Sequence, residues 1–345
     1  MKKFFFISVF LSQALFSQES AIDHAPIGIM VDHYHSQNEV MISFRHSVMY
    51  MEGNIFDGNS FQDDEIIELP HSLSSSPSNL SVVPQDMRMS MSMLGMMYAP
   101  NDRLTLMGMA MFMSNSMNLN TYQPMMSRDL IGTFETNSSG LSSISVGGLI
   151  PIQANDNSRL HLHVGLDKSS KDNEIKGEIL TPMNMLAEMI LPYGMQIGDD
   201  ALRFTGSLTY VRQTNNSSVI GFQGLFRKTL KEEAWAFGDQ KIFNAWYQKS
   251  LSQDLSWSAR FELKDQDKIS GSNMMIMQPV QTAYTENYGG TILNLSFGIN
   301  KVISLLPGIH PERIGLELII PVYQDKHGIQ MQDECSFILG IQKEI

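Results

Sequence analysis

Apolar and polar side chains alternate with a period of two over most of this chain, in segments of about ten residues. Residues 255–264 are a clear example, because Leu255, Trp257 and Phe261 alternate with serine, arginine and glutamate. Period two is that of a β-strand, in which successive side chains point to opposite faces. About twelve such segments follow one another, separated by turn residues. The pattern therefore predicts an all-β protein with an even number of antiparallel strands.

The links between these segments alternate between short and long. Tight links occur near Pro100 and Asn155, whereas longer ones cover residues 52–85, 114–140, 168–200 and 265–288. Short periplasmic turns, long external loops and alternating strands of about ten residues are typical of outer-membrane barrels. We expect an antiparallel transmembrane β-barrel of about twelve strands over residues 39–345, surrounded by outer-membrane lipid. A soluble β-sandwich or a lipocalin-like barrel is the alternative.

The start of the chain has the features of an export signal. Lys2 and Lys3 precede a short apolar run over residues 4–11, and a small-residue site follows near Ser17. We expect residues 1–17 to be a signal peptide and residues 18–38 to be a separate N-terminal segment. No later segment has the ~18 uninterrupted apolar residues that a spanning helix needs.

Composition narrows the classes of function. Methionine accounts for 26 of the 345 residues, and the formal net charge is −12, which makes nucleic acid an unfavourable partner. The single cysteine, Cys335, excludes an internal disulfide framework and any cysteine-cluster metal site. No nucleophile-elbow, zinc-protease, P-loop or dinucleotide motif occurs. We therefore expect a protein that is not an enzyme.

Methionine occupies every second position in two neighbouring segments. The two rows are Met87, Met89, Met91 and Met93, and Met107, Met109, Met111 and Met113. Turn residues at 98–103 link them, which predicts a hairpin. In the second row the intervening Leu106 and Phe112 suit lipid, so the methionines should face the lumen. The first row has polar and apolar neighbours alike, so both orientations remain open.

The preceding predicted strand contributes further methionines to the same side of the lumen. Ile42, Phe44 and Val48 suit lipid, which leaves Met49 and Met51 in the lumen. With a periplasmic N-terminus, the methionine-rich ends of all three strands approach the outer mouth. Thioethers are soft ligands that suit Cu(I). The candidate ligands are Met49, Met51, Met89, Met91, Met93, Met109, Met111 and Met113. The alternative is that methionine serves as a flexible apolar filler in place of leucine.

A second candidate site lies before the first strand. His24, Met30, His33 and His35 fall within twelve residues and could form a mixed imidazole–thioether copper site. The same segment could instead lie against the lumen as a plug. His161 and His163 alternate with leucine and valine on a later strand, and a hydrogen-bonded lumen network suits them better than metal ligation.

Four stretches carry a resemblance to a known family. They are residues 24–35, 87–100, 191–198 and 321–325. Together they resemble a bacterial family of methionine-rich outer-membrane transporter barrels, related to proteins named for the MetA pathway of phenol degradation. The resemblance spans essentially the whole mature chain. It implies a barrel and an outer-membrane location, and it implies little about the substrate.

These observations lead to three functional hypotheses. The first is an outer-membrane barrel that binds or passes a soft metal ion, Cu(I), through lumen and loop methionines. The second is a passive channel for small apolar or aromatic molecules, in which methionine is an adaptable lining. The third is a structural surface barrel whose loops carry the function.

Overall fold

The computed structural model describes residues 20–345 except 126, 156, 216 and 304–311. The expected signal peptide, residues 1–17, and the first two residues of the predicted N-terminal segment lie outside this range. Among the described residues, no helix has the length and apolar character needed to span a membrane.

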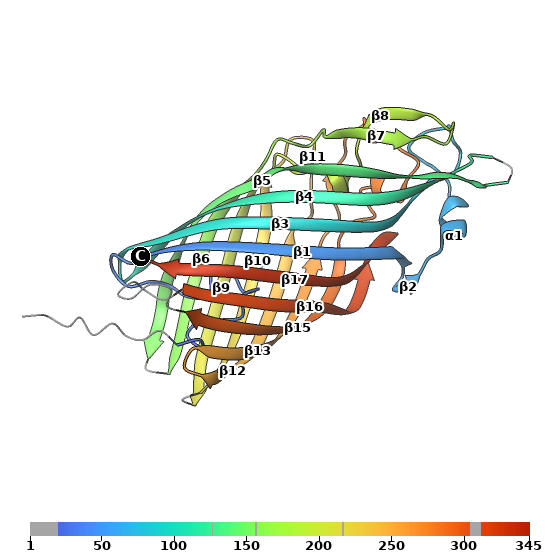
Figure 1. Cartoon of the computed structure of the whole chain (residues 1–345). Coiled ribbons are helices and arrows are strands. Elements are labelled where there is room, and N and C mark those ends of the chain that lie inside the picture. The colour runs from blue at the N-terminus through green and yellow to red at the C-terminus, as the bar shows by residue number, and fades with distance from the viewer. Residues whose placement is uncertain (1–19, 126, 156, 216, 304–311) are drawn as a thin grey trace, which may run out of the picture.

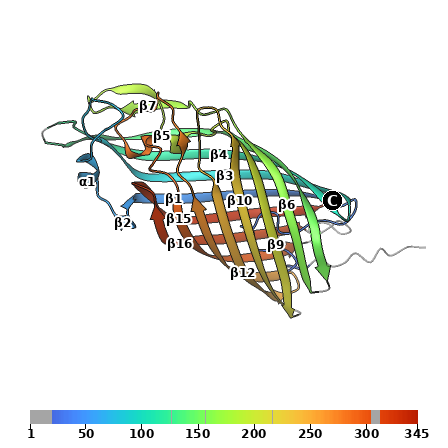
Figure 2. The same cartoon turned by 180° about the vertical axis from the view of Figure 1, so that it is seen from behind.

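The structure is a closed antiparallel barrel of twelve long strands (Figures 1 and 2). They are β1 (Val40–Phe56), β3 (Val82–Asn101), β4 (Leu104–Tyr122), β5 (Leu130–Asn155), β6 (Ser158–Ser169), β9 (Leu202–Asn215), β10 (Ser218–Lys231), β12 (Gln240–Ser252), β13 (Leu255–Gln266), β15 (Gly290–Ile303), β16 (Glu312–Lys326) and β17 (Gln330–Glu344). Each strand pairs with the next of these in the chain, and β17 pairs with β1 to close the ring. The predicted fold class is confirmed.

Long loops emerge from one end of the barrel and short turns from the other, as the sequence predicted. The long loops contain short elements of their own: β2 (Asn59–Ser60), α1 (Asp63–Ile67), β7 (Lys176–Leu180), β8 (Leu186–Ile190), η1 (Tyr193–Met195), β11 (Trp235–Ala236), β14 (Ser270–Gly271) and η2 (Gln281–Ala283). In outer-membrane barrels the long loops are external and the short turns periplasmic.

Two strands extend further than the sequence predicted. Residues 114–122 and 130–140 were expected in a loop, but they continue β4 and β5. Their outward side chains are polar, and Ser116 donates a hydrogen bond to Glu135 across the pair at 2.6 Å. A strand that rises above the bilayer faces water on its outer side, so the alternation that marks a lipid-facing strand disappears while backbone pairing continues.

The long loops fold together over the external end of the barrel. Their buried apolar side chains form the largest apolar cluster among the described residues, and this cluster also includes the inward-facing Met87 and Met117. Trp235 is fully buried, with its ring centroid 4.8 Å from that of Tyr193 and 5.3 Å from that of Phe237. The Arg128 guanidinium donates to the backbone carbonyls of Ile67 and Leu80. We call this assembly of loops the cap.

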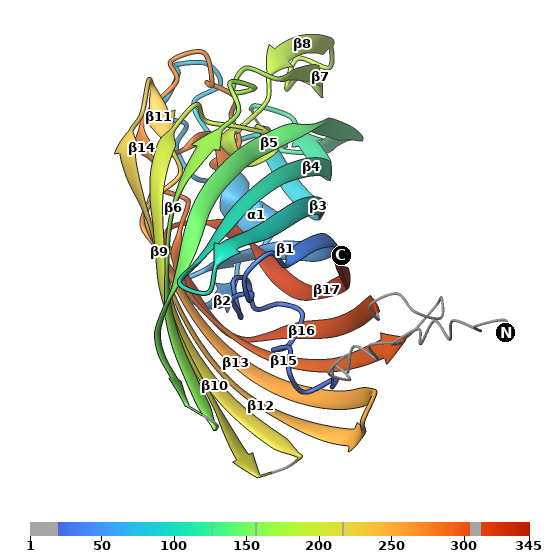
Figure 3. The ribbon, with the colours of Figure 1, turned by 90° about the vertical axis from the view of Figure 1, so that its left-hand side faces the viewer.

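Residues 20–38 lie inside the periplasmic end of the barrel (Figure 3). Ile22, Ala25 and Ile29 pack against Val211, Val219 and Trp246 of the wall. Lumen side chains bond the backbone of this segment as well: Gln248 Nε2 donates to the Ala21 carbonyl at 2.9 Å, and Gln223 Nε2 donates to the Met30 carbonyl at 2.8 Å. The segment is therefore held by apolar packing and by hydrogen bonds to several strands.

A buried ion pair between β13 and β16 also contacts this segment. Arg260 Nε donates to Glu317 Oε1 at 2.7 Å, and the other carboxylate oxygen accepts from the Gly28 backbone N–H at 2.6 Å. Both side chains are almost wholly shielded from solvent. Charges on this face suit a polar lumen and would be costly against lipid.

Replacing Glu317 with alanine should lower the free energy of unfolding by about 3 kcal/mol, because the buried Arg260 charge would lose its buried partner and keep only Glu262. Urea unfolding in lipid vesicles, followed by tryptophan fluorescence, measures the change. Asp254→Ala, which removes an exposed ion pair with Lys301, is the control and should have a much smaller effect. Equal losses for both variants would contradict this account.

The outward positions of the strands form an apolar band. Val146 on β5 is 58% exposed and points to lipid, whereas its neighbour Ser145 is buried in the lumen beside Met109. The two faces should therefore respond differently to polar substitution.

Val146→Arg should cost about 2–4 kcal/mol, the cost of a cation facing the middle of the bilayer. Met109→Gln places a polar group on the lumen side, where Ser145 offers a hydrogen-bond partner, and should cost less. The same vesicle unfolding assay compares the two. A larger loss for Met109→Gln would show that the faces are assigned the wrong way round.

Candidate functional site

The strand register places both methionine rows in the lumen. Met89 lies opposite Met49 of β1, and Met91 lies opposite Met113 of β4. Residues directly opposite each other in an antiparallel pair share a face. Met87 and Met117, which are also paired, are buried. The orientation that the sequence left open is therefore settled: the row from Met87 to Met93 faces inward.

Methionine is sorted by face on this wall. Every methionine of β1, β3 and β4 except Met96 faces the lumen. The apolar outward positions besides Met96 hold Ile42, Phe44, Val48 and Tyr50 on β1, Leu94 and Tyr98 on β3, and Leu106, Ala110 and Phe112 on β4. If methionine only replaced leucine as an apolar filler, it would also occur on the lipid side of the same strands. The sequence uses aliphatic and aromatic side chains there instead.

A cavity of about 230 Å³ lies where this wall meets the cap. We call it the methionine cavity. Its thioethers come from Met49, Met51, Met87, Met89, Met113, Met117 and Met331. Phe237, Tyr288 and Gly194 line it from the loops, and Lys264, Lys326 and Asp333 line it from β13, β16 and β17. Strands from around the barrel and the cap therefore enclose one largely apolar space with a few polar groups.

The polar groups around the methionine cavity largely satisfy one another. Lys326 Nζ lies 2.6 Å from Asp333 Oδ1. The Tyr288 hydroxyl accepts from the Gly194 backbone N–H at 2.8 Å and donates to the Thr282 carbonyl at 2.7 Å. Burial raises the pKa of Tyr288, so its phenol stays neutral at ordinary pH. The methionine sulfurs are thus the main uncommitted donors in the cavity.

The predicted methionine ligands divide between two levels of the lumen. Met49, Met51, Met89 and Met113 line the methionine cavity, whereas Met91, Met93, Met109 and Met111 lie on the same wall, mostly closer to the periplasmic end. The sequence missed Met331, Phe237 and Tyr288 as lining residues. Met331 belongs to the last strand, and strand closure alone brings it near β1, where it lies opposite Asn54.

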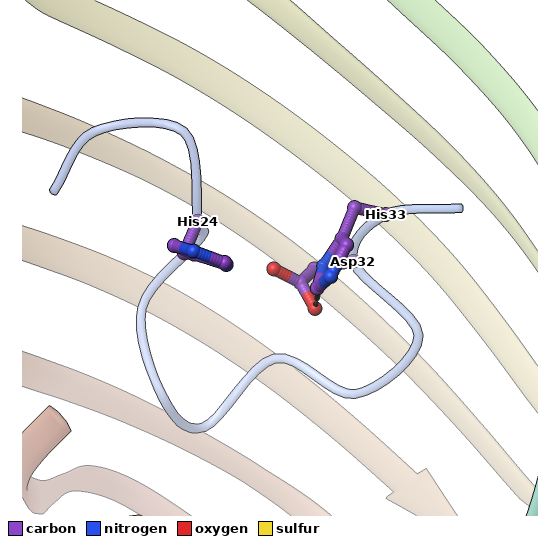
Figure 4. A group of neighbouring side chains, drawn as sticks. All are labelled: His24, Asp32 and His33. Atoms are coloured by element: carbon purple, nitrogen blue, oxygen red, sulfur yellow. Dashed lines mark ion pairs between the residues drawn. The ribbon is translucent and has the colours of Figure 1, made fainter. Parts of the chain in front are cut away.

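The histidines of the N-terminal segment form a second cluster, buried in the lumen near the periplasmic end. His24, Asp32 and His33 are all buried, and each can supply a donor atom within 4.8 Å of the others. Figure 4 shows His24 pointing across the bend of the segment toward Asp32 and His33. His33 Nδ1 lies 3.0 Å from Asp32 Oδ1, and the His24 and His33 ring centroids are 5.2 Å apart.

A wall residue joins this cluster. His33, His35 and Glu344 of β17 form a second group of donors within 4.8 Å of one another. His35 Nδ1 lies 3.4 Å from Glu344 Oε1. Met30, the predicted thioether ligand, directs its Sδ to the Arg45 guanidinium. The structure thus surrounds the imidazoles with carboxylates, and Glu344, more than 300 residues away in sequence, could not be paired with them from the sequence.

Burial and charge set the protonation of this cluster. Burial by itself would raise the pKa of Asp32, but His33, Arg313 and Arg45 together hold that pKa well below its ordinary value. Burial lowers the pKa of His33 despite the adjacent carboxylate. The pair therefore favours an ionised Asp32 beside a neutral His33. His161, on the predicted lumen face of β6, bonds the Val31 carbonyl through Nε2 at 2.8 Å.

The barrel resembles solved outer-membrane proteins. The P. putida toluene transporter TodX aligns with a TM-score of 0.41 at 9% identity, over 90% of this chain and 91% of that chain. A Pseudomonas aeruginosa FadL homologue aligns with a TM-score of 0.41 at 10% identity, over 89% and 90%.

A higher similarity relates the chain to an outer-membrane channel from Pseudomonas putida F1. The TM-score is 0.59 at 8% identity, over 92% of this chain and 100% of that chain. No protein-family model and no curated protein sequence matches the chain. The likeness to the channel is one of fold. Together with the closed twelve-strand barrel, it identifies the protein as a β-barrel of the outer membrane.

Proposed function

We propose that this protein is an outer-membrane transporter that binds a soft cation of the Cu(I) class in the methionine cavity. It then passes the cation along the inward-facing methionines of β1, β3 and β4, which we call the methionine wall. The observation that carries the proposal is the sorting of methionine to the lumen side of β1, β3 and β4, with Met96 as the exception. The proposal includes membership of the methionine-rich transporter family that the sequence resembles, and a role that is not enzymatic.

The thioether side chains of the methionine wall are suited to binding a soft ion. Thioethers are neutral and soft, so they suit Cu(I) better than Mg²⁺, Ca²⁺ or Zn²⁺. Opposite residues on adjacent strands have Cβ atoms about 5 Å apart, which lets two or three sulfurs converge on one ion. Met51, Met87 and Met117 form such a row across three strands, at the level of the cavity.

The methionine wall also supplies a route. At the lower edge of the cavity Met91 lies beside Met113, and below it Met93 lies beside Met111 and Met97 beside Met107. Met97 packs with Met41 against the N-terminal segment. Neighbouring weak sites along one wall would allow an ion to move by exchange of ligands from the external cavity toward the periplasmic end.

A second candidate function is a channel for small apolar or aromatic molecules. It is favoured by Phe237, Tyr288 and Ile292, which line the methionine cavity together with the flexible thioethers. Against it stands the lower lumen, which is lined by Arg45, Arg260, Glu317 and other buried charged groups. An apolar solute would meet these groups on its way through.

Replacing Met49, Met89 and Met113 together with leucine should weaken Ag(I) and Cu(I) binding at least tenfold, because the cavity loses three soft donors while its volume is nearly conserved. Ag(I) titration of the refolded full mature chain, and Cu(I) competition with a colorimetric chelator, measure the affinities.

The matched control replaces Met96, Met183 and Met185 with leucine, since these three lie outside the cavity and are exposed. It should bind as the wild type does. Equal binding by both triple variants would contradict the soft-cation proposal. Uptake of a phenolic solute into proteoliposomes that is insensitive to Cu(I) would favour the apolar channel.

A further inference from the structure

The cluster in the N-terminal segment differs in chemistry from the methionine wall. Its donors are the imidazoles of His24, His33 and His35 and the carboxylates of Asp32 and Glu344. Neutral imidazole with carboxylate is the donor set of Zn(II) and Cu(II) sites, whereas thioethers suit Cu(I). A ligand for this cluster therefore belongs to another class of ion from the proposed cargo of the wall.

His33 and His35 are both more than nine-tenths buried. In the part of the chain that the structure describes, the Nε2 atoms of both rings are among the buried nitrogens without a hydrogen-bond partner. Buried polar atoms in folded proteins are nearly always satisfied. A metal ion would satisfy a nitrogen of this kind, because a neutral imidazole nitrogen without a proton offers a lone pair.

Asp32 prepares His33 for this role. Its carboxylate lies 3.0 Å from His33 Nδ1. With the ring proton on that nitrogen, next to the carboxylate, Nε2 would be left as the metal donor. Metal-binding histidines commonly donate their other ring N–H to a carboxylate, which fixes the tautomer and the ring orientation.

We propose that His33, His35 and Glu344 bind one divalent transition-metal ion of the Zn(II) class, with Asp32 as a positioning residue, and that this ion fastens the N-terminal segment to the barrel. The three donors already lie within 4.8 Å of one another. Donors at about 2.0–2.1 Å from a tetrahedral zinc ion lie about 3.3 Å apart, so small side-chain movements complete the site.

The position of Glu344 on the barrel wall determines which parts of the chain a bound ion would connect. His33 and His35 belong to the segment, whereas Glu344 belongs to β17, the strand that closes the barrel on β1. Met41, near the start of β1, lies directly opposite Glu344. An ion bound by all three would connect the segment to the closing seam of the wall. The positive Arg313 nearby is itself engaged, because it donates to the Ala25 carbonyl and to Asn300 Oδ1.

The test is Zn(II) binding to the refolded full mature chain, measured by competition with a chromophoric chelator. The wild type should bind one ion per chain. His33→Ala and Glu344→Gln should each weaken binding at least tenfold. The matched control is His46→Ala, which removes an outward imidazole that bonds Ser92 on the barrel surface. It should bind Zn(II) as the wild type does.

Protease protection tests the fastening. Zn(II) should slow cleavage within residues 20–38 of the wild type and should not do so in Glu344→Gln. Absence of Zn(II) binding by the wild type, or binding unchanged in both His33→Ala and Glu344→Gln, overturns the proposal. Binding without protection overturns the fastening.

Two further measurements keep the two metal proposals separate. His33→Ala should retain wild-type Ag(I) binding, which also shows that the variant is folded. The Met49, Met89 and Met113 triple leucine variant should retain Zn(II) binding. Loss of Zn(II) binding in that triple variant would show that one site serves both ions and would contradict a separate zinc site.

Discussion

Every backbone N–H and C=O that crosses the hydrocarbon layer must find its partner within the protein, because lipid offers none. Here that requirement is met by twelve antiparallel strands closed through the β1–β17 pairing. Closure in turn gives each strand one lipid face and one lumen face. Arg45, Arg260 and Glu317 can be buried because they occupy the lumen face, and the same alternation places the methionine rows opposite one another.

The two ends of the lumen are filled by different parts of the chain and by different forces. At the external end the cap is an apolar core, with Trp235 between Tyr193 and Phe237. At the periplasmic end residues 20–38 are held by apolar packing and by lumen side chains that bond their backbone, such as Gln223 and Gln248. The methionine cavity therefore lies between a cap of loops and a lumen whose lower part is occupied.

Two sets of candidate ligands are separated along the barrel axis. The thioethers begin under the cap and continue down one wall, whereas the imidazoles and carboxylates meet near the periplasmic end. Soft and borderline donors select different ions, so the separation allows one protein to treat two metal ions differently. Met30 illustrates the division, since its sulfur contacts the Arg45 guanidinium, while Asp32 and Glu344 accompany the histidines.

The sequence alone predicted about twelve strands and the inward face of Met107 to Met113, because these follow from local alternation. It favoured a transmembrane barrel over a soluble sandwich, and the β1–β17 pairing decided the closure. It could not orient Met87 to Met93, whose neighbours Ser90 and Leu94 differ in polarity, and only the register with Met49 and Met113 decided that. Nor could it show that β4 and β5 continue above the bilayer, where alternation is lost. The cavity and the His35–Glu344 contact required tertiary structure, because strand closure and loop packing bring together residues that are distant in the chain.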